Sequence, residues 1–329
     1  MTSIVRSGRR RLRRLIGPVV YGALIGVLTP LHYGQTFLLR ARSRGRKGTT
    51  RQIPRVAATE VELDALMKAG QPVVIEGLGS SVDTNRYPDL ATLRSIAGQY
   101  TETFPVDVHD PTAPYFLYTG DYGLVVDHTE QLTLDQLLDR LFTDGDDRSA
   151  IYHQFASGSL AGATDEILQD MADHLADVVD LAPEPSASGV WIGSPGVVTP
   201  LHYDVWPGLL FPTHADKAVT MFAPDDAPNL YLESPFAVGG RWSHLPGLSA
   251  EADPESFDRL ARTTTHQATL HAGDALFIPP FWAHEMQALE ANISMPFRFS
   301  VQPTSYLNPR SLRALVEVFH RDYLRKRRR

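Results

Sequence analysis

Six short β-rich runs occupy much of residues 150–301, and each is bounded by Gly, Pro, Asn or Asp. The runs are AIYHQF (150–155), GVWIG (189–193), VVTPLHYD (197–204), KAVTMFAP (217–224), ALFIPP (275–280) and NISMPFRFSV (292–301). Helical patterns do not alternate regularly with these runs, as they would in a parallel βαβ sheet. The pattern therefore predicts a mainly β fold, an antiparallel sandwich or barrel with flanking helices.

Most of the predicted helices precede these runs, and one follows them. Four segments have apolar residues at helical spacing: 59–70 with Thr59 as N-cap, 87–100 ending at Gly98, 132–142 and 165–179. A further strand is predicted over 71–78. The amphipathic C-terminal helix, capped by Asn308, has one apolar face made of Leu312, Leu315, Val316 and Phe319. That face pairs with a second copy in a homodimer or packs on its own body, and both interpretations stay open.

Charge divides the 329-residue chain into three parts. Residues 1–51 hold 12 Arg and Lys and no acid, and residues 321–329 hold six basic residues and one Asp. The stretch 52–320 holds 13 basic and 37 acidic residues, a net charge of −24. Such an acidic body argues against a nucleic-acid-binding face, which needs clustered positive charge. The absence of cysteine excludes disulfides, thiolate metal sites and a cysteine nucleophile.

The basic N-terminal segment, residues 1–51, contains 25 residues, 15–39, without Asp, Glu, Lys or Arg. Such a length could span a bilayer, which needs about 20 residues, but prolines, glycines and a histidine interrupt it. A membrane-surface anchor with arginines on anionic lipid fits equally well, and so does a plain leader or a piece packed on the body. We expect a cytoplasmic protein, membrane-associated in the first two cases. The predicted organisation is the segment 1–51, a domain over 52–306, and a helix and basic tail over 307–329.

A histidine and an aspartate share one face of a predicted strand. In a strand, residues i and i+2 point to the same side, so His202 and Asp204 present an imidazole and a carboxylate together. With a second histidine they would form a 2-His-1-carboxylate triad, which leaves open positions on Fe(II). His284, which follows the bend at Pro279 and Pro280, is the candidate for that histidine. The pair His214 and Asp216 has the same spacing and is a competing candidate.

Three further residues suit a dicarboxylic cosubstrate beside such a metal. Lys217 begins a buried strand, where a charged amine requires a counter-anion. Thr199 and Tyr152 could donate hydroxyl hydrogen bonds to the same carboxylate. Each residue also has an ordinary alternative, a rim lysine or a core polar group.

The pentapeptide TPLHY occurs twice, at 29–33 and at 199–203. The first copy continues with Gly34 and has no carboxylate two residues after His32. The second continues with Asp204. We therefore interpret the first copy as coincidental and the second as part of the metal site.

The order and spacing of these motifs resemble those of the cupin-like JmjC oxygenases. The stretch VWIGSPGVVTPLHYD is followed by Lys217 and then by GDALFIPPFWAH, which ends in His284. The likeness is to the group that contains the asparaginyl hydroxylase of the hypoxia-inducible factor. It covers about residues 150–300, and more loosely 55–300.

This resemblance implies a double-stranded β-helix, or jelly roll, that uses Fe(II), 2-oxoglutarate and O₂. Matched position by position, His202, Asp204 and His284 correspond to the metal ligands. Lys217 corresponds to the lysine that pairs with the far carboxylate of 2-oxoglutarate, and Thr199 and Tyr152 to its hydroxyl partners. The chain departs from the family pattern at Gly208, Pro212 and Pro296, where Asn, Gln and Asn are usual. The departures bear on how substrate is held.

The resemblance implies a hydroxylase, or dioxygenase, that releases succinate and CO₂. Its expected substrate is a protein or peptide side chain or an amino-acid-derived molecule, with a small metabolite or a methylated lysine as alternatives. Two other functions remain: a non-catalytic binding or scaffold protein, and a metal-dependent cupin enzyme that does not use 2-oxoglutarate.

Overall fold

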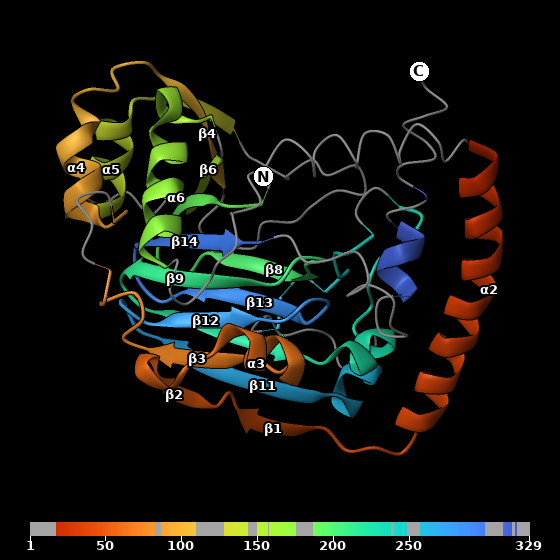
Figure 1. The fold of residues 1–329 in the computed structure, drawn as a ribbon. Coiled ribbons are helices and arrows are strands. Elements are labelled where there is room, and N and C mark those ends of the chain that lie inside the picture. Colours follow the sequence, from red (N-terminus) through yellow and green to blue (C-terminus); the bar gives the residue numbers. More distant parts are fainter. Residues whose placement is uncertain are drawn as a thin grey trace.

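Two β-sheets pack face to face in the computed structural model of this chain (Figure 1). The described residues are 18–82, 87–109, 128–143, 150–156, 158–175, 187–237, 240–245, 247–248, 257–299, 312–317 and 320. The smaller sheet has the order β1 (Thr49–Gln52), β11 (Thr264–Leu270), β10 (Lys217–Phe222), β13 (Ala283–Ala288) and β8 (Val198–Tyr203). The larger sheet has the order β2 (Arg55–Ala57), β3 (Val73–Glu76), β12 (Ala275–Ile278), β9 (Gly208–His214), β14 (Asn292–Arg298), β7 (Gly189–Gly193), β6 (Ala150–Ala156), β4 (Phe104–His109) and β5 (His128–Leu132).

From β8 to β14 the chain passes from one sheet to the other at nearly every connection. Only β10 and β11 follow each other within one sheet, and they pair antiparallel. This winding is the jelly roll that the motifs predicted, with its mainly β composition and flanking helices.

The central strands of the larger sheet, β12, β9 and β14, are buried on both faces, which explains their largely apolar sequences. In β9, Leu210 packs into the space between the sheets with Met221 and Leu276. Its neighbours Leu209 and Phe211 point the other way, into a second core. That second core includes apolar side chains of α4 (Leu90–Ala97), α5 (Leu134–Phe142) and α6 (Ala163–His174), which lie together at one end of the sheet in Figure 1. The remaining body helices are α3 (Leu63–Ala69), η1 (Ala58–Glu60), η2 (Leu160–Gly162), η3 (Pro224–Asn229) and η4 (Asp258–Arg262).

The six predicted β-rich runs are all strands, as is the predicted strand after Gln71. The four predicted body helices also form, although α6 extends only to His174 among the described residues. Thr59 as an N-cap is wrong, because it lies in a 3₁₀ turn and α3 is preceded by Glu62, which makes no side-chain cap. The sequence patterns missed β1, β2, β4, β5, β9 and β11. Of these, β1, β9 and β11 pair with strands that lie far away along the chain. Pairing with distant strands outweighs weak local propensity in such segments.

The apolar N-terminal segment forms α2 (Pro18–Ser43), which runs along one side of the body (Figure 1). The helix continues through Pro30, whose position removes one backbone hydrogen bond. In the described part of the chain, no helix combines the length and apolar composition that a bilayer crossing requires.

Near the C-terminus, residues 312–317 are helical. Ala314 and Val316 are buried within the single chain, and Leu312 and Leu315 are half-buried. Phe319 and the proposed cap Asn308 lie outside the described residues. Part of the apolar face therefore packs on its own body, and a homodimer through this helix stays a prediction.

Candidate metal centre

His202, Asp204 and His284 lie together between neighbouring strands. His202 in β8 is directly opposite His284 in β13, and their ring centroids are 4.4 Å apart. One possible ligand atom from each of the three residues lies within 4.8 Å of the others. Asp204 directly follows the last residue of β8. Its carboxylate lies beside the imidazole of His202, as the two-residue periodicity of a strand predicted.

Backbone hydrogen bonds fix how both imidazoles point. His202 Nδ1 lies 2.8 Å from the carbonyl oxygen of Pro200, and His284 Nδ1 lies 3.0 Å from that of Trp282. With Nδ1 donating to a carbonyl, Nε2 of each ring is left as the atom that can bind a metal. The ring of His202 also stacks on Trp242, with centroids 4.1 Å apart and planes 22° apart. The two ligand positions are therefore pre-oriented.

Burial keeps both histidines neutral at physiological pH. It lowers the pKa of His202. Burial, together with the repulsion that a protonated His202 would exert, also lowers the pKa of His284 to about 3. Neutral imidazole is the form that coordinates metals, so no proton has to leave before binding.

Asp204 is held ionised by cations on two sides. Arg298 Nη2 lies 2.8 Å from Asp204 Oδ2, and Arg241 Nη1 lies 3.8 Å from Oδ1. Burial alone would raise the pKa of Asp204, but Arg298, the two histidines and Arg241 hold it well below its usual range. Two neutral imidazoles and one carboxylate are the donor set of a facial triad, so these residues fit a divalent iron ion.

Gly208 explains how Arg298 reaches the site. Arg298 is only 2% exposed and lies opposite Gly208 in the pairing of β14 with β9. A Cβ atom at Gly208 would lie 2.6 Å from Arg298 Cδ and 2.8 Å from the carbonyl oxygen of Phe297. Glycine in place of the usual asparagine at position 208 thus makes room for the guanidinium that contacts Asp204. Sequence reasoning missed Arg298, although a lone arginine in an apolar strand of an acidic body was a signal for it.

Lys217 is buried at the start of β10, and its hydrogen-bond partners among the described residues are neutral. Its Nζ donates to Asn292 Oδ1 at 2.8 Å and to Ser294 Oγ at 3.3 Å. No carboxylate of the described residues lies within ion-pair distance of it. Burial lowers the pKa of this amine to about 8. A buried ammonium that lacks a counter-ion among the described residues can be neutralised by an external anion.

Tyr152 and Thr199 hydrogen-bond to each other, and Gln154 Nε2 donates to the Tyr152 hydroxyl at 3.2 Å. Tyr152 is opposite Gly193 in β7, and Gly193 is opposite Asn292, the partner of Lys217. A Cβ atom at Gly193 would lie 3.5 Å from both Tyr152 and Asn292.

Neighbouring strands therefore bring Tyr152, Thr199 and Lys217 to one region. Asn292 was not predicted from the sequence. It lies four residues before Pro296, where the family pattern would place an asparagine.

The competing pair lies elsewhere. Asp216 Oδ2 is 2.7 Å from His271 Nδ1 on the surface, and the His214 ring packs edge-on against Phe142. Ala215 between them has a φ of 62°, so the two side chains do not follow strand periodicity. This local turn explains why equal sequence spacing does not produce a second triad.

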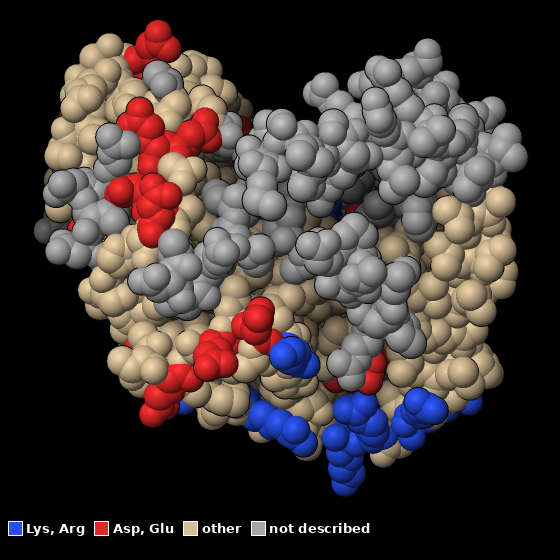
Figure 2. All heavy atoms as spheres, viewed as in Figure 1, with Lys and Arg blue, Asp and Glu red and all other residues tan. Residues whose placement is uncertain are grey.

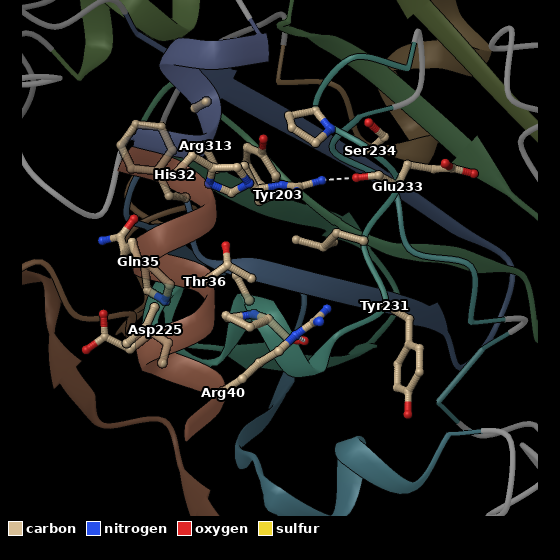
Figure 3. Close-up of a pocket in the computed structure, with 18 of the residues that line it drawn as sticks. His32, Gln35, Thr36, Arg40, Tyr203, Asp225, Tyr231, Glu233, Ser234 and Arg313 are labelled. Carbon is tan, nitrogen blue, oxygen red and sulfur yellow. Dashed lines mark hydrogen bonds between the residues drawn. The ribbon is translucent and has the colours of Figure 1, made fainter. Parts of the chain in front are cut away.

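A cavity of about 270 Å³ lies between α2 and the body (Figure 3). Its lining includes Tyr203, but none of the three candidate metal ligands. Tyr203 points away from His202 and donates a hydrogen bond to Glu317 Oε2 at 2.9 Å. The cavity is therefore on the opposite side of β8 from the candidate metal centre.

Comparison with known proteins places the fold and the motifs in one family. The family described as "Cupin-like domain" matches residues 58–305. Jumonji C domain-containing protein 5 of Drosophila melanogaster is 32% identical over 108 residues, which are 32% of this chain and 26% of that protein. Human tRNA wybutosine-synthesizing protein 5 is 32% identical over 104 residues, which are 32% of this chain and 31% of that protein. HSPB1-associated protein 1 of Rattus norvegicus is 31% identical over 105 residues, which are 31% of this chain and 22% of that protein. The alignments span a third or less of each relative.

Proposed function

The chain belongs to the family of cupin-like domains of the JmjC type, and we propose that it is an Fe(II)- and 2-oxoglutarate-dependent hydroxylase. The observation that carries the proposal is the buried cluster of His202, Asp204 and His284. A buried lysine without a carboxylate partner among the described residues lies in the same jelly roll. A metal triad and an anion-binding amine are the two things that binding of 2-oxoglutarate beside iron requires.

The metal would be held by Nε2 of His202 and His284 and by the Asp204 carboxylate. Bound iron supplies redox chemistry with O₂, with three protein ligands leaving positions for other molecules. The protein fixes the ligand positions. Pro200 and Trp282 orient the imidazoles, and Arg298 holds one carboxylate oxygen. These contacts are the outer partners that keep metal ligands in place.

Lys217 would bind the distal carboxylate of 2-oxoglutarate, with Thr199 and Tyr152 donating hydrogen bonds. Its present partners, Asn292 and Ser294, orient the ammonium without neutralising it. A charge-assisted hydrogen bond in a buried place is stronger than one in water.

The reaction consumes 2-oxoglutarate, O₂ and a substrate C–H bond, and produces succinate, CO₂ and the hydroxylated substrate. One oxygen atom enters succinate and the other enters the new hydroxyl group. The substrate class proposed is a protein or peptide side chain or an amino-acid-derived molecule. The net charge of −24 over residues 52–320 disfavours nucleic acid and favours a basic or neutral partner.

Two alternative functions can be compared with the observed residues. A cupin enzyme that does not use 2-oxoglutarate has no need of a buried cationic Lys217, whose burial is unfavourable. A non-catalytic binding protein would keep the fold without turnover, and the departures at Pro212 and Pro296 are compatible with it.

Anaerobic addition of Fe(II) and 2-oxoglutarate to the full-length protein tests the proposal. We expect a weak visible charge-transfer band that is lost in His202→Ala and kept in the matched variant His214→Ala. Wild-type protein that binds iron but shows no band contradicts the use of 2-oxoglutarate. A band without succinate formation on exposure to O₂ and candidate substrates favours the binding protein.

Protonation of Lys217 should make the binding of 2-oxoglutarate depend on pH. Because its pKa in the free protein is about 8, the affinity for 2-oxoglutarate should be constant below that pH. Above it, the apparent Kd should rise by about tenfold per pH unit, as the amine loses its charge before the dianion binds. Titrations of the visible band at several pH values measure this.

Lys217→Met provides the control for that dependence. It should weaken binding by about 10–100-fold, the effect of losing a hydrogen bond to a charged group, and remove the inflection near pH 8. In the metal-free state the variant should also unfold at a higher temperature than wild type, since it removes a buried charge that has no counter-ion in the part of the chain that the structure describes. Unchanged binding in Lys217→Met assigns the lysine a structural role.

A further inference from the structure

Helix α2 turns polar side chains toward the body in its C-terminal half. His32 and Ser43 are buried, and Gln35 and Thr36 are half-buried. Figure 3 shows His32, Gln35, Thr36 and Arg40 beside the cavity under the helix. A helix that packs on a soluble protein normally turns its apolar face inward, so this arrangement leaves apolar residues for the outer face.

The outer face of α2 is accordingly apolar. Among the described residues, six large apolar side chains are exposed, and five of them are on α2, with 52–66% of their surface accessible. These five are Val27, Leu31, Tyr33, Phe37 and Leu38. Val27, Leu31 and Leu38 follow each other at spacings of four and seven, and Tyr33 and Phe37 at a spacing of four, so the five form two rows along the outer face, which we call together the apolar stripe. A contiguous exposed apolar stripe of this kind marks an interaction surface.

A basic cluster lies at the C-terminal end of the same helix. We define it as the exposed residues Arg42, Arg44, Lys47 and Arg51. No carboxylate of the described residues forms an ion pair with any of the four. In Figure 2 the part of α2 visible at the right edge carries no Lys, Arg, Asp or Glu side chain, and blue side chains gather at its lower end and along β1. The 17 residues that precede α2 in the sequence carry six more arginines and no acid.

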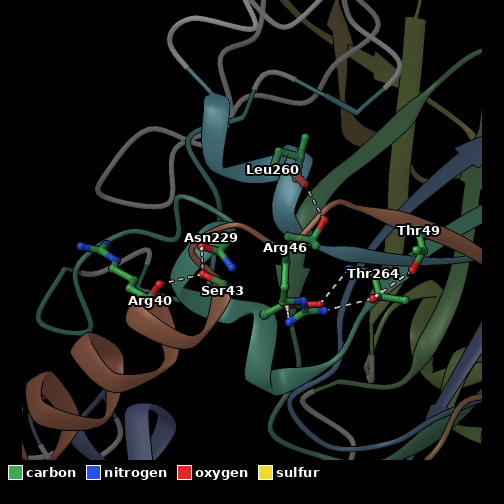
Figure 4. Close-up of polar contacts among 9 residues, drawn as sticks. Arg40, Ser43, Arg46, Thr49, Asn229, Leu260 and Thr264 are labelled. Atoms are coloured by element: carbon green, nitrogen blue, oxygen red, sulfur yellow. Dashed lines mark hydrogen bonds and ion pairs between the residues drawn. The ribbon is translucent and has the colours of Figure 1, made fainter.

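Polar contacts fix the helix so that this face stays outward (Figure 4). Ser43 Oγ donates to Asn229 Oδ1 at 3.3 Å, and Arg40 Nε donates to the Pro228 carbonyl oxygen at 3.4 Å. Arg46 pairs with Asp226 at 3.2 Å and donates to Thr264. Arg46 is thus an anchor to the body, and the four residues of the basic cluster remain available to a partner.

We propose that the outer face of α2 docks on an anionic lipid surface. The apolar stripe would enter the boundary between headgroups and acyl chains, and the basic cluster would lie on the anionic headgroups. The acidic body, with a net charge of −24 over residues 52–320, would be repelled, so only the side that carries α2 can face the lipid. A second copy that covered the stripe with its own α2 would present no acidic residue to the basic cluster, because residues 1–51 contain neither Asp nor Glu.

Vesicle co-sedimentation of the full-length protein tests this, with pure phosphatidylcholine and with an equal mixture of phosphatidylcholine and phosphatidylglycerol. We expect binding to the anionic vesicles only, weakened as salt rises. Arg42→Gln/Arg44→Gln should weaken binding by about 25-fold, since each basic residue near an anionic surface is worth about fivefold. The matched pair Lys68→Gln/Arg94→Gln, which makes the same change in net charge away from α2, should bind like wild type.

The triple variant Leu31→Ser/Phe37→Ser/Leu38→Ser tests the apolar stripe. It should lose binding to anionic vesicles, whereas Leu289→Ser, at the exposed apolar residue outside α2, should keep it. Because the three positions are exposed, circular dichroism and thermal unfolding should be unchanged.

Wild-type binding by the triple variant contradicts docking through this face and assigns any lipid binding to the basic tails. A wild-type dimer in light scattering that the triple variant dissociates shows that a second copy is the occupant. The visible band with Fe(II) and 2-oxoglutarate should be the same in all these variants, so the result is independent of the proposed enzyme activity.

Discussion

Succinate formation in the variant Asp204→Gly should fall by at least about 100-fold, more than the loss usual when only an outer partner of a metal ligand is removed. The substitution makes the second TPLHY copy, at 199–203, continue like the first, at 29–33. Two imidazoles at the candidate centre would remain without the carboxylate that lies beside them. Iron binding by calorimetry and succinate formation by mass spectrometry measure the two consequences.

Two control variants separate the loss of a metal ligand from unfolding. Asp204→Gly leaves Arg298 buried without its carboxylate, which costs about 3–5 kcal/mol, so the fold must be checked by circular dichroism. His202→Ala removes a ligand without leaving a charge unpaired and should also abolish turnover. His32→Ala, in the first copy of the pentapeptide, should retain it. Turnover in a folded Asp204→Gly or His202→Ala protein contradicts the proposed centre.

The variant Arg298→Met should lower the free energy of unfolding by about 3–5 kcal/mol in the metal-free protein, because it leaves the Asp204 carboxylate without its main counter-ion. Arg241, at 3.8 Å, would compensate only in part. Denaturant unfolding gives this free energy, and iron titration should show weaker binding in the same variant. The carboxylate would no longer be held in place by the guanidinium.

Arg94→Met is the matched control, because Arg94 pairs with the exposed Asp139 and should contribute only about 0–1 kcal/mol. A companion variant is Gly208→Ala, whose new methyl group would collide with the Arg298 side chain and the Phe297 carbonyl oxygen. It should destabilise the protein and weaken iron binding without removing any charge. Equal, small losses in Arg298→Met and Arg94→Met show that the buried pair does not hold Asp204.

Structure that depends on residues close together in the sequence could be predicted from the sequence. The strand periodicity of two residues placed His202 and Asp204 together, and bounded apolar runs marked six strands of the barrel. Apolar spacing predicted α4 and α5, and the structure adds two equally local features that this prediction did not use, the N-cap Asp89 and the capping box of Thr133 with Gln136. The bend at Pro279 and Pro280 made His284 a candidate ligand, but its place opposite His202 depends on the pairing of β13 with β8, which the local sequence does not give.

Side-chain contacts that depend on the register between paired strands were decided by the tertiary structure. Arg298 contacts Asp204, and Asn292 contacts Lys217, because β14 pairs with β9 on one side and β7 on the other. A shift of one residue in either pairing would turn these side chains to the opposite face. In the sequence, Gly208 is only the absence of an asparagine that the family usually has. In the structure, the missing side chain at Gly208 leaves the space that Arg298 occupies.

The N-terminal segment shows the same division. The sequence alone determined that residues 15–39 are uncharged and lie between clusters of basic residues. It did not determine which side of the helix would be covered, because apolar residues occur all around it. Packing decided this: contacts of α2 with the body hold His32 and Ser43 inward and leave Phe37 and Leu38 outward. Residue types and short spacings are properties of the chain, whereas exposure depends on which surfaces the folded body provides.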